Sequence, residues 1–203
     1  MELENFPIIA EGDNRYYGGD QAWYRNKFHA EAGCGPTSGA NLAAFYGMEL
    51  KPITPGGCLF EKEAFINLMD VMYTYMTPGM MGFPYYQKYI NCFLKFSEER
   101  KHSFCAYSMR SWKMVSEPVS FVKQAINSGN PVPFIILLHA EKALENNQWH
   151  WMTITGYGED GESIILSNNG KREVYDSQIL FSVHPHNKMR LIYFMRKNAE
   201  NPN

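Results

Sequence analysis

The amino-acid sequence predicts an α+β fold in one domain, with helices in the first half and a mostly antiparallel sheet in the second. The chain of 203 residues has the length of a single domain, and its 45% hydrophobic residues suffice for a substantial core. Apolar residues recur at helical spacing before residue 101, whereas most strand-like runs follow it. We therefore expect one domain over residues 1–203, with a helical half over about residues 1–100 and a sheet half over about residues 101–203.

The first predicted helix begins near Cys34 and ends at Gly47. Pro36 suits its first turn, because the N–H that proline lacks is not used there. Gly47 suits the left-handed conformation that commonly closes a helix. Small residues predict close packing of this helix on its neighbours: Ser38, Gly39, Ala40, Ala43 and Ala44.

The remaining elements follow from periodicity and from turn residues. Helices are predicted over residues 61–75, 84–100 and 118–127, with a loop over residues 77–84. About five strands are predicted, among them residues 103–109, 134–139, 150–157, 163–168 and 190–195. A short turn rich in Asp, Glu and Gly separates residues 150–157 from 163–168, which predicts a hairpin.

Cys34 is the first candidate catalytic residue, because its neighbours favour a reactive thiolate. Gly33 and Gly35 leave the sulfur sterically open, and the N-terminus of a helix favours negative charge. This position predicts a thiol pKa below the usual value of about 8.5. A buried structural cysteine in front of an ordinary helix is the alternative interpretation, since free cysteines are among the most buried residues.

His150 is the candidate base, and the predicted hairpin supplies it with a partner. The start of the first strand lies near the end of the second, so that Asn168 or Asn169 can approach the His150 ring. An amide oxygen that accepts the ring N–H fixes the tautomer and leaves the other nitrogen facing the thiol. A core histidine is the alternative for His150 taken alone, and His139 is the other histidine that we consider as a base.

At these positions the chain resembles the papain-like superfamily of cysteine peptidases, and within it the bacteriocin-processing, double-glycine-leader peptidase-like family. The resemblance rests on Gly33-Cys34-Gly35-Pro36-Thr37-Ser38, on the run from His150 to Tyr157 and on Asn168. It implies a papain-like cysteine proteinase fold, a catalytic Cys34, a general base His150 and an orienting Asn168. It also implies an oxyanion donor at Gln21, although the spacing from Gln21 to Cys34 is longer than in papain.

The resemblance has two further limits. Close relatives often carry Asp where this chain has Asn168, and residues 51–115 contain no motif of the family.

Four apolar residues are candidate substrate contacts. Met81 and Phe83 lie in the predicted loop, where they border a groove for an apolar peptide side chain or, alternatively, pack beneath the helices. Trp149 and Trp151 flank His150, where an aromatic ring would exclude water and strengthen the attraction between thiolate and imidazolium. Both tryptophans could equally belong to the core.

Together these residues predict a cysteine peptidase-like hydrolase that cleaves a peptide or amide bond through a thioester. Two alternatives stay open. The same Cys, His and Asn could carry out acyl transfer or glutamine deamidation, or the chain could be a catalytically silent peptide-binding domain. The expected partner is a peptide or protein substrate, and the oligomeric state is not predicted.

Composition excludes several other classes of protein. A formal net charge of −2, without a basic run interleaved with aromatic residues, argues against a nucleic-acid partner. The four cysteines lack zinc-like spacing and His184-Pro185-His186 is interpreted as a turn, so that no metal and no cofactor are expected. Lys171-Arg172-Glu173 is interpreted as a solvated hairpin face.

The chain has no apolar run that could span a bilayer, no signal-peptide pattern at its N-terminus and no paired cysteines, which predicts a cytoplasmic protein without a membrane partner.

Overall fold

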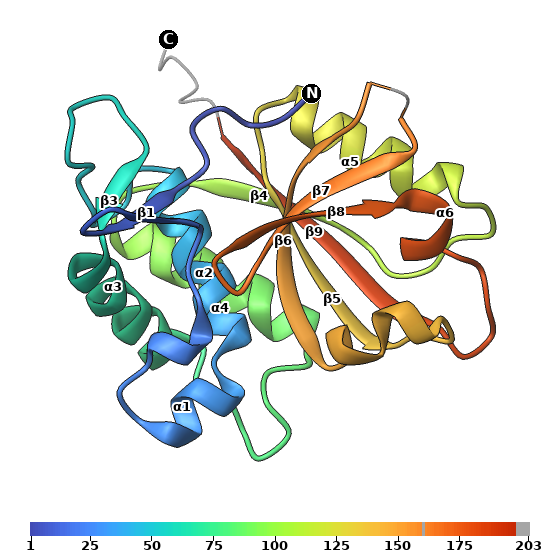
Figure 1. Ribbon diagram of the computed structural model, residues 1–203, viewed down its shortest axis with the longest axis horizontal. Helices are drawn as coiled ribbons and strands as arrows, with labels where there is room; N and C mark the ends of the chain where they lie inside the picture. Colours follow the sequence, from blue (N-terminus) through green and yellow to red (C-terminus); the bar gives the residue numbers. More distant parts are fainter. Residues whose placement is uncertain (160, 198–203) are drawn as a thin grey trace, which may run out of the picture.

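The computed structural model describes residues 1–159 and 161–197, which form two sheets with helices packed on them (Figure 1). The larger sheet is antiparallel, and its six strands lie in the order β4-β9-β5-β6-β7-β8. Their bounds are Phe104–Met109 for β4, Lys188–Arg196 for β9, Val132–Leu138 for β5, His150–Tyr157 for β6, Ser163–Asn168 for β7 and Lys171–Asp176 for β8. The smaller sheet has the order β2-β1-β3, with bounds Asn14–Tyr17, Ile8–Glu11 and Leu59–Glu61.

Most of the helical structure precedes the large sheet, as predicted. The helices of the first half are α1 (Lys27–Ala32), α2 (Cys34–Phe45), α3 (Lys62–Tyr75) and α4 (Tyr86–Glu99). The second half adds α5 (Ser116–Asn127) and α6 (Ser177–Leu180), and two 3₁₀ turns complete the list, η1 (Gln21–Trp23) and η2 (Lys142–Asn147). The α+β class is therefore confirmed.

The central strands of the large sheet are buried on both faces, whereas the edge strands β4 and β8 are largely exposed. Successive side chains of a strand point to opposite faces, so that neighbours in β5, β6 and β9 enter two different cores. One core joins the sheet to α2, α3 and α4 through Ile135, Trp151, Ile192 and Phe194. The other core lies against α5 and includes Phe134, Met152, Ile154, Leu191 and Tyr193. Burial of each such large side chain contributes about 1.5–3 kcal/mol relative to its exposure.

The helix that carries Cys34 agrees with its prediction at both ends. It begins at Cys34, and Gly47 follows its C-cap with a φ of 71° and a hydrogen bond from its N–H to the Ala44 carbonyl. All of its residues from Cys34 to Ala44 are buried, because α3, α4 and β6 surround it. A helix that is enclosed on its sides by other elements is a rigid support for a reactive residue.

The predicted number of about five strands is wrong, because the described residues contain nine. The unpredicted ones are β8 and the three strands of the small sheet. Strands of three or four residues are too short to show a clear alternation of side chains. The pairing of β1 with β3 is parallel and joins segments that lie far apart in the sequence, so no local turn announces it.

Two further findings concern the state of the cysteines and the length of the apolar helices. Cys34, Cys58, Cys92 and Cys105 are all free. Within residues 1–159 and 161–197, no helix combines the length and the apolar character needed to cross a bilayer.

Candidate active site

Cys34 lies at the first position of α2, and crowding by the last turn of α1 and by the Tyr24 ring explains the glycine before it. A Cβ atom at Gly33 would lie 2.4 Å from the His29 carbonyl oxygen and 2.4 Å from the Tyr24 ring. A Cβ atom at Gly35 would lie 3.1 Å from Phe83. Only glycine therefore fits at position 33 without a shift of the backbone. The Cys34 side chain that follows is buried, with 7% of its surface exposed.

Burial dominates the electrostatics of the thiol. It raises the pKa of Cys34 above its ordinary value, and backbone hydrogen bonds from Trp151, Gly35 and Cys34 itself offset part of this rise. The position of Cys34 at a helix N-terminus predicted a lowered pKa for its thiol. That prediction is wrong for the resting protein, because the loss of solvation outweighs the contribution of the backbone N–H groups.

His150 and Asn168 meet as the hairpin of β6 and β7 requires. The His150 Nε2 atom lies 2.8 Å from Asn168 Oδ1. An amide oxygen only accepts, so Nε2 carries the proton and Nδ1 is left as the basic nitrogen. Burial lowers the pKa of His150, while Asn168 and the charges of Glu173 and Asp20 act in the opposite direction.

Asn169, the other candidate for this contact, has a different position. It adopts a φ of 46° in the turn between β7 and β8, a conformation that asparagine tolerates better than most residues. Asn168 is therefore the residue that contacts the imidazole.

Cys34 and His150 line one small cavity between α2 and β6. Figure 1 shows these two elements packed side by side. Gly19, Asn41, Ser167 and Asn169 line the same cavity. The structure thus brings the candidate nucleophile and the candidate base together from distant parts of the sequence.

Hydrogen bonds one turn after Cys34 hold α2 in place. Ser38 Oγ lies 3.1 Å from Thr153 Oγ1 of β6 and 3.1 Å from the Tyr89 hydroxyl of α4. The Tyr89 ring stacks on Trp151, with a centroid distance of 4.3 Å. These contacts join the helix of the cysteine to the strand of the histidine.

The segment before η1 closes the other side of the cavity. Its backbone bonds to the turn between β7 and β8, with Gly170 N donating to Gly19 O at 3.0 Å. Gly19 N donates to Asn41 Oδ1 of α2 at 2.8 Å. Gly18 has a φ of 75°, and a Cβ atom there would lie 2.5 Å from Ser167 Oγ. The unpredicted strand β2 therefore delivers this segment to the site.

Gln21, the predicted oxyanion donor, uses one of its side-chain N–H groups for a hydrogen bond outside the cavity. Its Nε2 donates to the Ala30 carbonyl oxygen at 2.8 Å, and its Oε1 is buried without a hydrogen-bond partner among the described residues. Gln21 does not line the cavity that Cys34 and His150 share. Its catalytic role stays a prediction.

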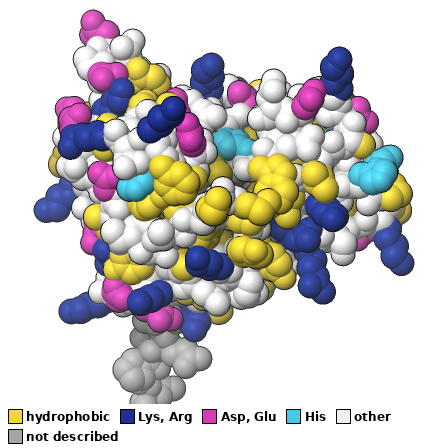
Figure 2. Space-filling model, turned by 90° about the horizontal axis from the view of Figure 1, so that it is seen from below, with side chains coloured by type: hydrophobic (Ala, Val, Ile, Leu, Met, Phe, Trp, Pro, Cys, Tyr) yellow, Lys and Arg dark blue, Asp and Glu magenta, His cyan; other side chains and the backbone are white. Residues whose placement is uncertain are grey.

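The four candidate substrate contacts divide into two pairs. Met81 and Trp149 are 69% and 48% exposed and line a groove that also reaches Cys34. Phe83 and Trp151 are each 3% exposed, and Trp151 Nε1 donates to the Phe83 carbonyl oxygen at 2.6 Å. Figure 2 shows hydrophobic side chains gathered across one face of the molecule. Met81 and Trp149 can therefore touch a ligand directly, whereas Phe83 and Trp151 lie beneath the surface.

His139, the alternative base, is committed to the fold. It is buried, its Nδ1 accepts from Glu141 N at 3.1 Å, and its Nε2 lies 3.3 Å from the Leu180 carbonyl oxygen. Because both ring nitrogens have partners, His139 has no nitrogen left for the Cys34 proton.

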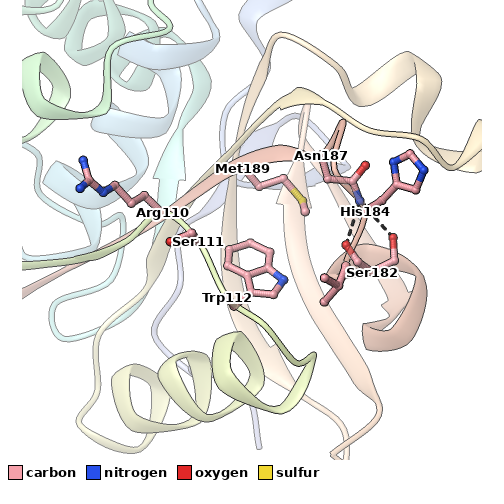
Figure 3. Close-up of a pocket in the computed structure, with 8 residues that line it drawn as sticks. Arg110, Ser111, Trp112, Ser182, His184, Asn187 and Met189 are labelled. Carbon is pink, nitrogen blue, oxygen red and sulfur yellow. Dashed lines mark hydrogen bonds between the residues drawn. The ribbon is translucent and has the colours of Figure 1, made fainter.

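A separate pocket lies between residues 110–112 and 182–189 (Figure 3). His184 borders it, and Asn187 donates to Ser182 O at 2.8 Å. His184 and His186 belong to a turn in which Asn187 N donates to the His184 carbonyl oxygen, as predicted. Within the described residues, no group of three or more His, Cys, Asp or Glu side chains could hold a metal ion.

Glu173 is the site residue that sequence reasoning missed. The interpretation of residues 171–173 as a solvated face is wrong for Glu173, which is half-buried and accepts from Asn168 Nδ2 at 3.0 Å. In β8 it lies directly opposite Leu166 and therefore diagonal to Asn168 on the same face of the sheet. The alternation of Glu173 and Tyr175 after the turn at Asn169-Gly170 is the sequence signal that could have revealed it.

A comparison with family models matches residues 20–182 to the Peptidase_C39 like family. The matched span includes Gln21, Cys34, His150 and Asn168. A comparison with curated proteins finds no match. The α+β architecture, with the cysteine on a buried helix and the histidine on an antiparallel sheet, is consistent with the papain-like fold that the sequence predicts. The chain belongs to the Peptidase_C39 like family.

Proposed function

We propose that this protein is a cysteine peptidase-like hydrolase with Cys34 as the nucleophile, His150 as the general base and Asn168 as the residue that orients His150. The observation that carries the proposal is the 2.8 Å contact between His150 Nε2 and Asn168 Oδ1, at a cavity that His150 shares with Cys34. This contact leaves His150 Nδ1 free to take a proton. Family membership supports the same class of activity.

The proposed reaction begins from a neutral pair. Burial raises the pKa of Cys34 and lowers the pKa of His150, and both shifts favour thiol and imidazole over thiolate and imidazolium. His150 Nδ1 takes the thiol proton as the sulfur attacks the substrate carbonyl carbon. The imidazolium then donates this proton to the leaving amine as the C–N bond breaks. Water, activated by His150, hydrolyses the thioester and returns Cys34 to its thiol form.

We propose the Cys34 backbone N–H and the Gln21 side chain as donors to the oxyanion. The Gln21 amide has two N–H groups, and Ala30 accepts from one of them. In this proposal the other N–H donates to the oxyanion of a substrate bound at the thiol. Such donors stabilise charge that appears only in the transition state.

The proposed substrate is a peptide or protein segment with an apolar side chain near the cleaved bond. The groove beside Cys34 is lined by Met80, Met81 and Trp149, and Met80 is 99% exposed. Flexible methionine side chains adapt to apolar groups of different shapes.

A cytoplasmic location is proposed as well, and the four free cysteines support it, because thiols stay reduced in that compartment.

The test is mass spectrometry of a peptide library after incubation with the wild type and with Cys34→Ala. A hydrolase produces pairs of fragments whose masses sum to the parent plus water, and Cys34→Ala produces none. A gain of about one dalton on glutamine-containing peptides would indicate deamidation, and a conjugate would indicate acyl transfer. Peptide binding without any product in either protein would contradict the proposal in favour of a silent binding domain.

A further inference from the structure

A chain of side-chain hydrogen bonds extends outward from the imidazole of His150. Asn168 Nδ2 donates to Glu173 Oε2 at 3.0 Å, on the side of the amide opposite to His150. The Tyr175 hydroxyl donates to the same carboxylate oxygen at 2.9 Å. Asn147 Nδ2 donates in turn to the Tyr175 hydroxyl at 2.8 Å. The chain thus connects β6, β7, β8 and η2.

The carboxylate at its centre determines the direction of these bonds. An ionised carboxylate only accepts, so the Asn168 group that faces Glu173 must be the NH₂ group. The Asn168 oxygen must then face His150, which requires the proton on Nε2. Without Glu173, the Asn168 amide could turn over and present its NH₂ group to the ring, and Nδ1 would no longer be the basic nitrogen.

We propose that Glu173 is a positioning residue of the active site, which orients the Asn168 amide and through it selects the tautomer of His150. The inference rests on the proposed function, since it assigns Glu173 to the reaction of Cys34 and His150. Glu173 does not line the cavity of the cysteine and the histidine; it acts through Asn168.

The charge of Glu173 gives the proposal a second consequence. The acidic groups that act on His150 are Glu173 of β8 and Asp20 of the segment before η1, and both stabilise the imidazolium against the effect of burial. Cys34 of α2 lines the same cavity as His150, and the titratable Tyr175 side chain of β8 hydrogen-bonds to Glu173. Asparagine at position 168 also fits this arrangement, because an aspartate there would place two carboxylates about 3 Å apart, a contact that opposes the ionisation of both.

Three variants test the proposal: Glu173→Gln, Asn168→Asp and the double variant that combines them. The readouts are the rate of Cys34 alkylation by iodoacetamide and the ¹H NMR titration of His150, the latter in a Cys34→Ala background. Asn168→Asp should slow alkylation about tenfold, a change typical of side chains in one network. Glu173→Gln should slow it less, because the glutamine amide oxygen can still accept from Asn168 Nδ2 in one of its two orientations. Glu173→Gln should also move the titration of His150 to lower pH. The double variant should recover both readouts, because the introduced glutamine amide can donate to the introduced aspartate carboxylate, which then accepts from Nε2.

Two controls separate this role from general damage to the fold. Glu63→Gln removes an exposed carboxylate of α3 that pairs with Arg25, and it should change neither readout. Tyr175→Phe keeps the charge of Glu173 and removes one hydrogen bond, so it should leave the titration of His150 closer to wild type than Glu173→Gln does.

Two results would overturn the inference: an unchanged titration of His150 in Glu173→Gln, or a double variant no faster than the slower single variant. Neither readout requires a peptide substrate. A wild type that cleaves no peptide would therefore refute the proposed function, while the alkylation and titration data would still decide the role of Glu173.

Discussion

At the scale of single residues, burial shifts the titration of Cys34 and of His150 in opposite directions. The pKa of the thiol is raised and the pKa of the imidazole is lowered, so that each group alone is neutral over a wide range around neutral pH. Reactivity then depends on the transfer of a proton between them. A helix N-terminus next to the sulfur does not by itself lower the pKa of the Cys34 thiol. A local sequence motif cannot predict this outcome, because it does not show how deeply the thiol is buried.

This coupling predicts the pH dependence of thiol alkylation. Neutral imidazole can take the Cys34 proton, and protonated imidazole cannot. Because burial lowers the pKa of His150 below its ordinary 6.5, we expect the rate to fall only below pH 6.5. In His150→Ala the base is absent and the thiol pKa is raised, so alkylation should become appreciable only above the ordinary thiol value of about 8.5. Iodoacetamide kinetics from pH 4 to 10 measure both limits, and overlapping profiles of the two proteins would refute the coupling.

Gln21 allows a separate prediction about the oxyanion. Loss of one donor typically lowers the rate about 10²–10³-fold, so Gln21→Ala should reduce kcat by that order and leave KM nearly unchanged. Gln124→Ala on the exposed side of α5 is the matched control and should keep the wild-type rate. Steady-state kinetics on a cleaved peptide measure the effect. A Gln21→Ala enzyme as fast as wild type would assign the second donor to another group.

At the scale of elements, the contact between α2 and β6 sets the separation of nucleophile and base. Ser38 bonds to Thr153 and to Tyr89, and all three side chains are buried. Ser38→Ala leaves two buried hydroxyl groups without this partner, which should lower the free energy of unfolding by about 1–3 kcal/mol. The exposed Ser108→Ala should cost far less. Urea denaturation compares the two variants, and equal midpoints would mean that Ser38 does not brace the site.

The elements also show which parts of the site a sequence can predict. Both ends of α2 and the hairpin of β6 and β7 depend on local signals, such as Pro36, Gly47 and the polar turn, and their prediction is confirmed. The small sheet depends on pairing between distant segments, and the position of Glu173 depends on the register of β7 with β8. Non-local pairing of this kind leaves little trace in a short stretch of sequence. The residues at the end of β7 predicted only that Asn168 or Asn169 contacts the His150 ring, without deciding between them.

At the scale of the whole molecule, buried histidines link stability to pH. The pKa values of His139 and His150 are lowered by burial, so the folded state binds fewer protons than the unfolded state once the pH falls below the ordinary value of 6.5. Stability is therefore complete above that pH and declines as the pH falls through it. The lowered carboxyl pKa of Glu2, which hydrogen-bonds to Arg172, acts in the same direction only at lower pH, below its ordinary 4.5. The window from about pH 6.5 to 5 thus belongs to the histidines.

His139 provides the test of this linkage, because it does not line the cavity of Cys34 and His150. We expect the free energy of unfolding of the wild type to fall between pH 7 and pH 5, and His139→Gln to reduce this slope by removing one buried group that must stay neutral. His186→Gln, at an exposed position in the turn after α6, should keep the wild-type slope. Urea titrations at a series of pH values measure all three proteins. A slope that is the same in His139→Gln and in the wild type would place the acid sensitivity in other groups, with His150 as the first to examine.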